Sequence, residues 1–83
     1  MQSVVRGIVR GMGSESECTL TLWTEHSLSG RRFTRCRISG ESLNLPDGSY
    51  TVSFEGHTLF TRRWLGEWML NFLPSHIRVG DAA

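Results

Sequence analysis

The fold is decided by residues 18–38, which read CTLTLWTEHSLSGRRFTRCRI. On either side of a central Ser-Leu-Ser-Gly the side chains alternate between apolar and polar, and a period of two is typical of strands with one buried face. Gly30 ends a three-residue loop, where the backbone needs a left-handed conformation that glycine adopts without strain. The stretch therefore predicts an antiparallel β-hairpin.

The loop length also predicts which residues face each other across this hairpin. The opposed pairs are Leu20 with Ile38 and Leu22 with Cys36 on the inner face, and Thr21 with Arg37, Trp23 with Arg35 and Glu25 with Phe33 on the outer face. A slip of one residue would turn the arginines into the core, so the pattern specifies this register strongly.

The rest of the chain indicates further short strands. Thr, Val and aromatic residues are frequent, Ala occurs only at the C-terminus, and nine glycines punctuate the chain, which favours strands and tight turns over helices. We expect an all-β fold, a small antiparallel barrel or curled sandwich of five to six short strands with SH3-like or OB-like geometry. At most one helical turn is expected, near Glu41 to Leu45.

The positions of these elements follow from the alternation and the turn residues. The expected strands are residues 4–12, 18–26, 31–38, 49–55, 57–64 and 67–73, with a short edge strand at 77–79. Residues 13–17 are expected to form a polar, acidic loop, Gly7 is interpreted as a bulge, and turns are expected at Glu55-Gly56 and Leu65-Gly66. The alternation points Tyr50, Val52, Phe54, Leu59, Thr61, Trp68, Leu70 and Phe72 inward.

The length of 83 residues predicts a single β domain over residues 1–83, with a short tail from about Gly80. The first apolar stretch is interrupted by Arg6 and Arg10 and does not resemble a secretion signal. No apolar run approaches the roughly 20 residues of a membrane helix. We therefore expect a cytoplasmic protein that makes no membrane contact.

Arginines gather on the outer face of the predicted hairpin. All nine basic residues are arginine, four of them lie within residues 31–37, and eight acidic residues reduce the net charge to +1. A GC-rich genome explains arginine in place of lysine but does not explain the clustering. Guanidinium groups bind carboxylates, phosphates and aromatic faces. The predicted partner-binding residues are Trp23, Arg31, Phe33, Arg35 and Arg37, with Arg62, Arg63 and Trp64 of a second cluster as an extension.

Each cluster also has a purely structural interpretation. In the first, Arg35 lies over Trp23 as a cation–π pair on a solvated hairpin face, or the N-terminal strand or the tail covers Trp23 and Phe33. In the second, Trp64 packs on Met69 beside the turn.

Two functions would use such a face. It can bind the acidic surface of a protein partner, or it can bind single-stranded or structured nucleic acid by stacking bases on its aromatic rings. The pI of 7.9 lies below the value of about 9 that is typical of nucleic-acid-binding domains, and this favours the protein partner. We expect a non-enzymatic interaction module, a free-standing inhibitor or adaptor of the kind that mobile elements encode. Homodimerisation through an edge strand or the aromatic face stays open.

The sequence contains no recognisable motif for catalysis or metal binding. The chain has no Gly-x-Ser-x-Gly, no phosphate-cradling glycine loop and no carboxylate pair at a telling spacing. Cys18, Cys36, His26, His57 and His76 lack the spacing of metal ligands. We expect no enzymatic activity, no cofactor and no metal, and we expect both cysteines to be small buried side chains without a disulfide.

Overall fold

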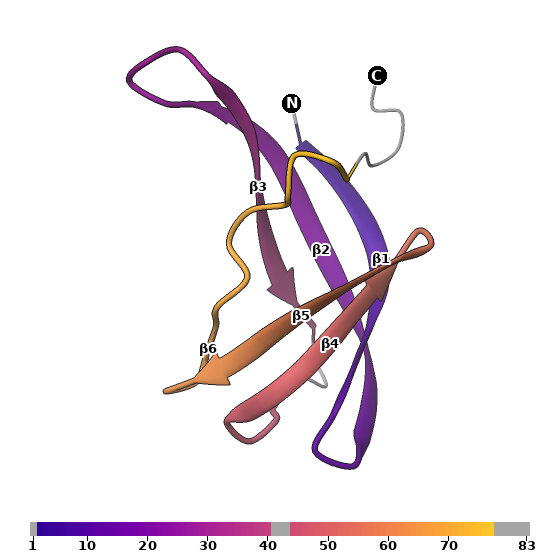
Figure 1. Cartoon of the computed structure of the whole chain (residues 1–83). Coiled ribbons are helices and arrows are strands. Elements are labelled where there is room, and N and C mark those ends of the chain that lie inside the picture. The colour runs from indigo at the N-terminus through magenta and orange to yellow at the C-terminus, as the bar shows by residue number, and fades with distance from the viewer. Residues whose placement is uncertain (1, 41–43, 78–83) are drawn as a thin grey trace.

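Six antiparallel strands form one sheet that curls into a nearly closed barrel (Figure 1). The structure is a computed structural model and describes residues 2–40 and 44–77. The strands are β1 (Gln2–Gly11), β2 (Ser14–His26), β3 (Arg32–Ser39), β4 (Gly48–Phe54), β5 (His57–Trp64) and β6 (Glu67–Trp68). They lie in the order β3-β2-β1-β4-β5-β6. The predicted all-β barrel of five to six strands is confirmed.

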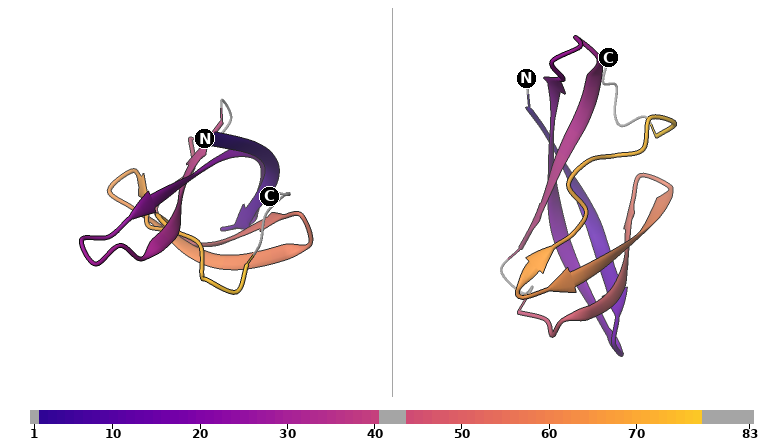
Figure 2. Two further views of the ribbon diagram at one scale, coloured as in Figure 1. Left: turned by 90° about the horizontal axis from the view of Figure 1, so that it is seen from above. Right: turned by 60° about the vertical axis from the view of Figure 1, so that its left-hand side comes forward.

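The barrel closes between its first hairpin and the segment that follows β6. Arg35 of β3 and Phe72 form an isolated antiparallel bridge. Beside it, the N–H of Cys36 donates to the carbonyl of Asn71 at 2.9 Å, and the N–H of Leu73 donates to a β3 carbonyl at 2.9 Å. Figure 2 shows this segment running along β3, and its view from above shows the ring that results.

The hairpin of β2 and β3 has the predicted register. Trp23 pairs with Arg35 and Leu22 with Cys36, and the Gly30 N–H closes the loop by donating to the Ser27 carbonyl at 2.9 Å. The inner residues of both strands are buried, whereas Arg37 on the outer face is exposed.

The core occupies the inside of the barrel and draws on every long strand but β5. The buried residues are Val9, Cys18, Leu20, Leu22, Cys36, Ile38, Tyr50, Val52, Phe54 and Leu73. Leu59, Trp68 and Leu70 are partly buried against this cluster. Tyr50 meets Trp68 edge-on, with ring centroids 5.3 Å apart, and its hydroxyl donates to the Pro46 carbonyl. The inward positions predicted for β4 are confirmed.

The expected acidic loop at residues 13–17 was wrong. β2 begins at Ser14, and only Met12 and Gly13 connect it to β1. Both turn residues have positive φ, 54° and 75°, which is the geometry of a two-residue type I′ turn. Because such a turn matches the twist of its strands, the ladder continues to the tip, where Arg10 and Glu15 form an ion pair at 3.0 Å.

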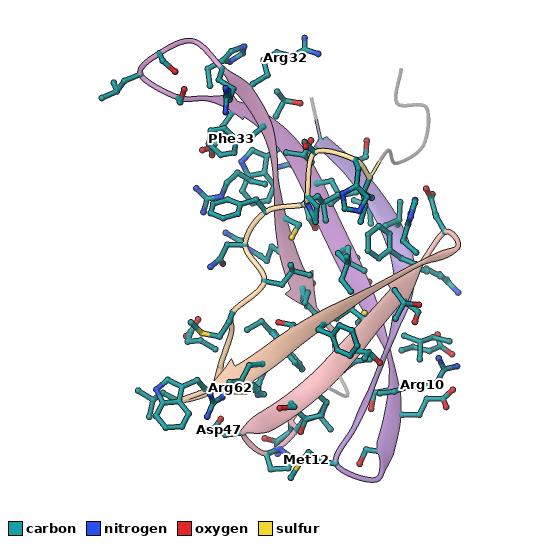
Figure 3. The ribbon with its side chains drawn as sticks, viewed as in Figure 1. Arg10, Met12, Arg32, Phe33, Asp47 and Arg62 are labelled. Atoms are coloured by element: carbon teal, nitrogen blue, oxygen red, sulfur yellow. The ribbon has the colours of Figure 1, made fainter. Side chains whose placement is uncertain are left out.

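Two further hairpins use the same turn with an unfavourable first residue. Glu55 and Leu65 have φ of 47° and 52°, and the glycines that follow have φ of 80° and 77°. The carboxylate of Asp47 supports the second turn, since it accepts from the N–H of Leu65 at 2.8 Å and from the N–H of Gly66 at 3.2 Å (Figure 3). Both turns lie where the sequence predicted them.

The sequence suggested a bulge at Gly7, and this prediction was wrong. It pairs in continuous register with Cys18. A Cβ at this position would lie 2.7 Å from Cδ1 of Leu20 and 2.9 Å from the carbonyl oxygen of Ser53. Glycine is needed here because β1 approaches the backbone of β4 closely at the start of their pairing.

The prediction for residues 67–73 needs two corrections. Only Glu67–Trp68 is a strand, and Phe72 lies outside, 55% exposed, while Leu73 takes the core position. The alternation slips by one residue because the backbone changes partner here. Just before the slip the Met69 N–H donates to β5, and just after it the Asn71 carbonyl accepts from β3.

Of the edge strand expected at residues 77–79, the structure describes only Ile77, which is not in a strand. The Ile77 N–H donates to the Pro74 carbonyl at 3.0 Å and ends a turn. Residues 78–79 and the tail from Gly80 lie outside the described residues, as do 41–43 of the expected helical turn. Asn44 and Leu45 are not helical. In the part of the chain that is described, no helix has the length and apolarity to cross a membrane.

Replacing Leu65 by Asn should stabilise the protein. Leu65 is 77% exposed, so little burial is lost, and Asn tolerates the left-handed conformation that costs other residues about 1–2 kcal/mol. We expect Leu65→Asn to raise the free energy of unfolding by about 1 kcal/mol in urea titrations. As a control, Gly66→Ala meets no atom within 4 Å and should lower it through backbone strain alone. An unchanged or lower stability of Leu65→Asn would contradict the turn assignment.

Replacing Gly7 by Ala should destabilise the protein. The new methyl group would press against the Ser53 carbonyl, which is backbone and cannot rotate away. We expect a loss of about 1–3 kcal/mol, the usual effect of overpacking, measured by urea titration. A variant as stable as the wild type would show that β1 and β4 are farther apart than described.

Candidate binding groove

A groove of about 500 Å³ lies between the C-terminal half of β3 and β6. Its lining includes Trp23, Arg35, Arg37, Ile38, Arg63, Glu67, Trp68 and Asn71. Residues 71–73 bond to β3 on one side of it, but the described residues of β3 and β6 do not pair with each other. The groove is therefore the place where the barrel stays open.

The guanidinium groups of this groove lie near the rings of two tryptophans, Trp23 and Trp68. The Cζ atoms of Arg35 and Arg37 lie 5.9 and 6.0 Å from the ring centroid of Trp23, as the hairpin register requires. The Cζ of Arg63 lies 4.8 Å from the ring centroid of Trp68, its partner in the β5–β6 pairing. These distances are within the range of cation–π attraction. The structure thus joins Arg63 of the second predicted cluster to the first cluster.

The groove lining holds the guanidinium groups of Arg35, Arg37 and Arg63 and the carboxylate of Glu67. The Glu25 carboxylate accepts from Nε1 of Trp23 at 2.8 Å and from Nη1 of Arg35 at 3.4 Å, which partly neutralises Arg35. Among the described residues, Arg37 and Arg63 form no ion pair, and the Nε atoms of Arg35 and Arg63 are buried without a hydrogen-bond partner. The charges of Arg37 and Arg63 are therefore not neutralised by an ion pair within the described part of the chain.

Phe33 is partly buried and does not line the groove. Its ring meets that of Phe72 edge-on at 6.0 Å, and the Cζ of Arg35 also lies 5.9 Å from the Phe72 centroid. Phe72 belongs neither to the N-terminal strand nor to the expected tail, so this contact is not the covering that the sequence suggested. Phe72 was missed as a site residue because the slip after Leu70 cannot be seen in the local alternation.

The remaining predicted site residues lie away from the groove lining. Arg62 stacks on Trp64 at 5.0 Å on the outer face of β5, where Phe60 is 85% exposed. Figure 3 shows Arg62 well below Phe33 in that view. Arg31 lies at the hairpin loop, where its N–H donates to Oγ of Ser27 at 3.2 Å. Trp68 and Glu67 do line the groove but were not predicted as site residues.

Both cysteines are free and buried, as predicted. The Cys36 thiol donates to the Leu70 carbonyl at 3.7 Å, next to the backbone bond from Cys36 to Asn71 that helps to close the barrel. Burial raises its pKa from 9.0 to about 11, although the nearby charge of Arg35 acts in the opposite direction. Burial also raises the pKa of Cys18. The described residues contain no group of three or more His, Cys, Asp and Glu side chains placed to hold a metal ion.

No protein-family model, curated protein or solved structure matches this chain.

The Cys36 thiol should make stability fall at alkaline pH. Because its pKa is higher in the folded chain than the ordinary 9.0, the thiol stabilises the fold fully below pH 9, and this contribution is lost as pH rises towards 11. We expect the urea midpoint to fall between these values, and to fall less in Cys36→Ala, where that group is missing. Parallel pH profiles for the two proteins would contradict the assignment.

Proposed function

We propose that this protein is a non-enzymatic interaction module that binds an acidic segment of a protein partner in the groove between β3 and β6. The supporting observation is the stacking of Arg35 and Arg37 on Trp23 and of Arg63 on Trp68 around one groove. A module of this kind acts as an adaptor or inhibitor through binding alone.

The stacking favours carboxylates over nucleobases. A guanidinium that lies over an indole keeps its N–H edge available, and that edge matches a carboxylate with two parallel hydrogen bonds. The same guanidinium occupies the indole face on which a base of single-stranded nucleic acid would stack. In this groove each tryptophan has a guanidinium near its ring, at 6.0 Å for Arg37 and Trp23 and at 4.8 Å for Arg63 and Trp68.

The charge of the chain and the burial of Arg63 also favour carboxylates over nucleic acid as the ligand. Hydrogen bonds to charged groups contribute about 1.5–3 kcal/mol where water is partly excluded, and Arg63 is half-buried. Over the whole chain the net charge is only +1, which gives weak long-range attraction for a polyanion. Recognition would therefore depend on a few close contacts with carboxylates.

The experiment compares two charge reversals on exposed outer-face positions. Arg37→Glu changes the groove, whereas Arg6→Glu on β1 changes the total charge equally and lies outside the groove lining. Immobilised proteins are exposed to a lysate of the organism that encodes them, and captured proteins are quantified by mass spectrometry. We expect Arg37→Glu to lose its partner by about tenfold or more and Arg6→Glu to retain it.

The nucleic-acid alternative is tested in parallel. Labelled single-stranded DNA and RNA are titrated at about 50 and 200 mM salt, a range over which phosphate-driven binding weakens strongly. Tight, salt-sensitive binding that Arg37→Glu abolishes would replace the protein partner by nucleic acid. If folded Arg37→Glu retains every partner, the groove is not the binding site.

A further inference from the structure

β3 has backbone groups that point into the groove and form no backbone hydrogen bond there with any other described residue. The Ser27 N–H donates to the Arg31 carbonyl, and from this pair onward every second residue of β3 bonds to β2. The residues between them direct their N–H and C=O groups to the other side, as Cys36 does towards Asn71. Ile38 is the next residue of this kind, and among the described residues its N–H and C=O form no backbone bond on that side.

β6 presents a matching edge on the opposite wall. The Met69 N–H donates to the Arg62 carbonyl, so the neighbouring Trp68, opposite Arg63, lies at a position whose N–H and C=O point away from β5. Ile38 and Trp68 both line the groove. An open strand edge therefore borders the groove on each side.

Arginines lie on both faces of this gap. Arg37 is exposed on the outer face of β3, whereas Arg63 follows the inner alternation of β5 and stacks on Trp68. A strand placed between β3 and β6 would direct alternate side chains to these two faces. Acidic side chains on both faces would then meet Arg37 and Arg63, neither of which forms an ion pair with another described residue.

We infer that the acidic partner segment binds in extended form, as an added strand between β3 and β6 that completes the barrel. Main-chain hydrogen bonds to Ile38 and Trp68 hold the segment, and Arg37 and Arg63 select acidic residues on its two faces. This inference rests on the proposed function and specifies how the same groove binds its ligand.

The probe is the acetylated and amidated peptide Thr-Glu-Val-Glu-Asp-Glu-Thr, added to the full-length chain labelled with ¹⁵N. Affinity is measured by calorimetry, and amide hydrogen exchange is followed by NMR. We expect the amides of Ile38 and Trp68 to exchange about tenfold or more slowly in the complex. N-methylation of every second peptide amide should weaken binding by about tenfold or more, and so should replacing the acids by Gln and Asn.

Two neighbouring arginines of β5 provide a matched control. Arg63→Gln removes a charge stacked on Trp68 in the groove, whereas Arg62→Gln removes one stacked on Trp64 on the outer face. We expect only Arg63→Gln to weaken peptide binding. Arg37→Gln, at an exposed position, tests the same point if Arg63→Gln does not fold.

The outcomes separate this inference from the proposed function. If binding needs the acids but tolerates N-methylation and leaves amide exchange unchanged, strand addition is overturned and the acidic groove stands. If the peptide does not bind although Arg37→Glu loses its cellular partner, strand addition is again overturned. Protection of the same amides without peptide, increasing with protein concentration, would assign the edge to a second copy of this chain.

Discussion

The rest of the structure depends on the short backbone pairing between β3 and residues 71–73. This pairing turns an open sheet into a ring and brings Leu73 over the core beside Cys36. An antiparallel sheet with one apolar face cannot leave that face in water, and residues 2–40 and 44–77 contain no helix to cover it. Curling the sheet on itself buries the inner face with the residues at hand and pairs part of an edge that would otherwise be exposed.

The closure is incomplete, and this is what creates the groove. To change partner from β5 to β3 the backbone slips by one residue, which moves Phe72 outside, against Phe33. Beyond that point the described residues of β3 and β6 do not pair with each other. The backbone groups of Ile38 and Trp68 therefore point into the groove between the two strands. Arg37 of β3 and Arg63 of β5 both line this groove, beside the two unpaired strand edges.

Much of the site could be predicted from local pattern. Trp23, Arg35 and Arg37 lie on neighbouring strands of one hairpin, and loop length with alternation sufficed to place them together. Arg62 and Arg63 are adjacent in sequence and were assigned to the same surface. Alternation sends them to opposite faces of β5, but only closure of the barrel makes the inner one, Arg63, a neighbour of the β3 arginines.

The sequence by itself determined most of the strands, the turns at Glu55-Gly56 and Leu65-Gly66 and the β2–β3 register, because these follow from contacts between residues close along the chain. The type I′ turns and the buried alternation are set by local sterics and by the burial of one face. Only the tertiary structure decided that β1 pairs with β4 and that residues 71–73 close on β3. Pairing between distant strands has no local signature, because the entropy of loop closure changes little between one long loop and another, and the selection is made by how well the whole inner face packs.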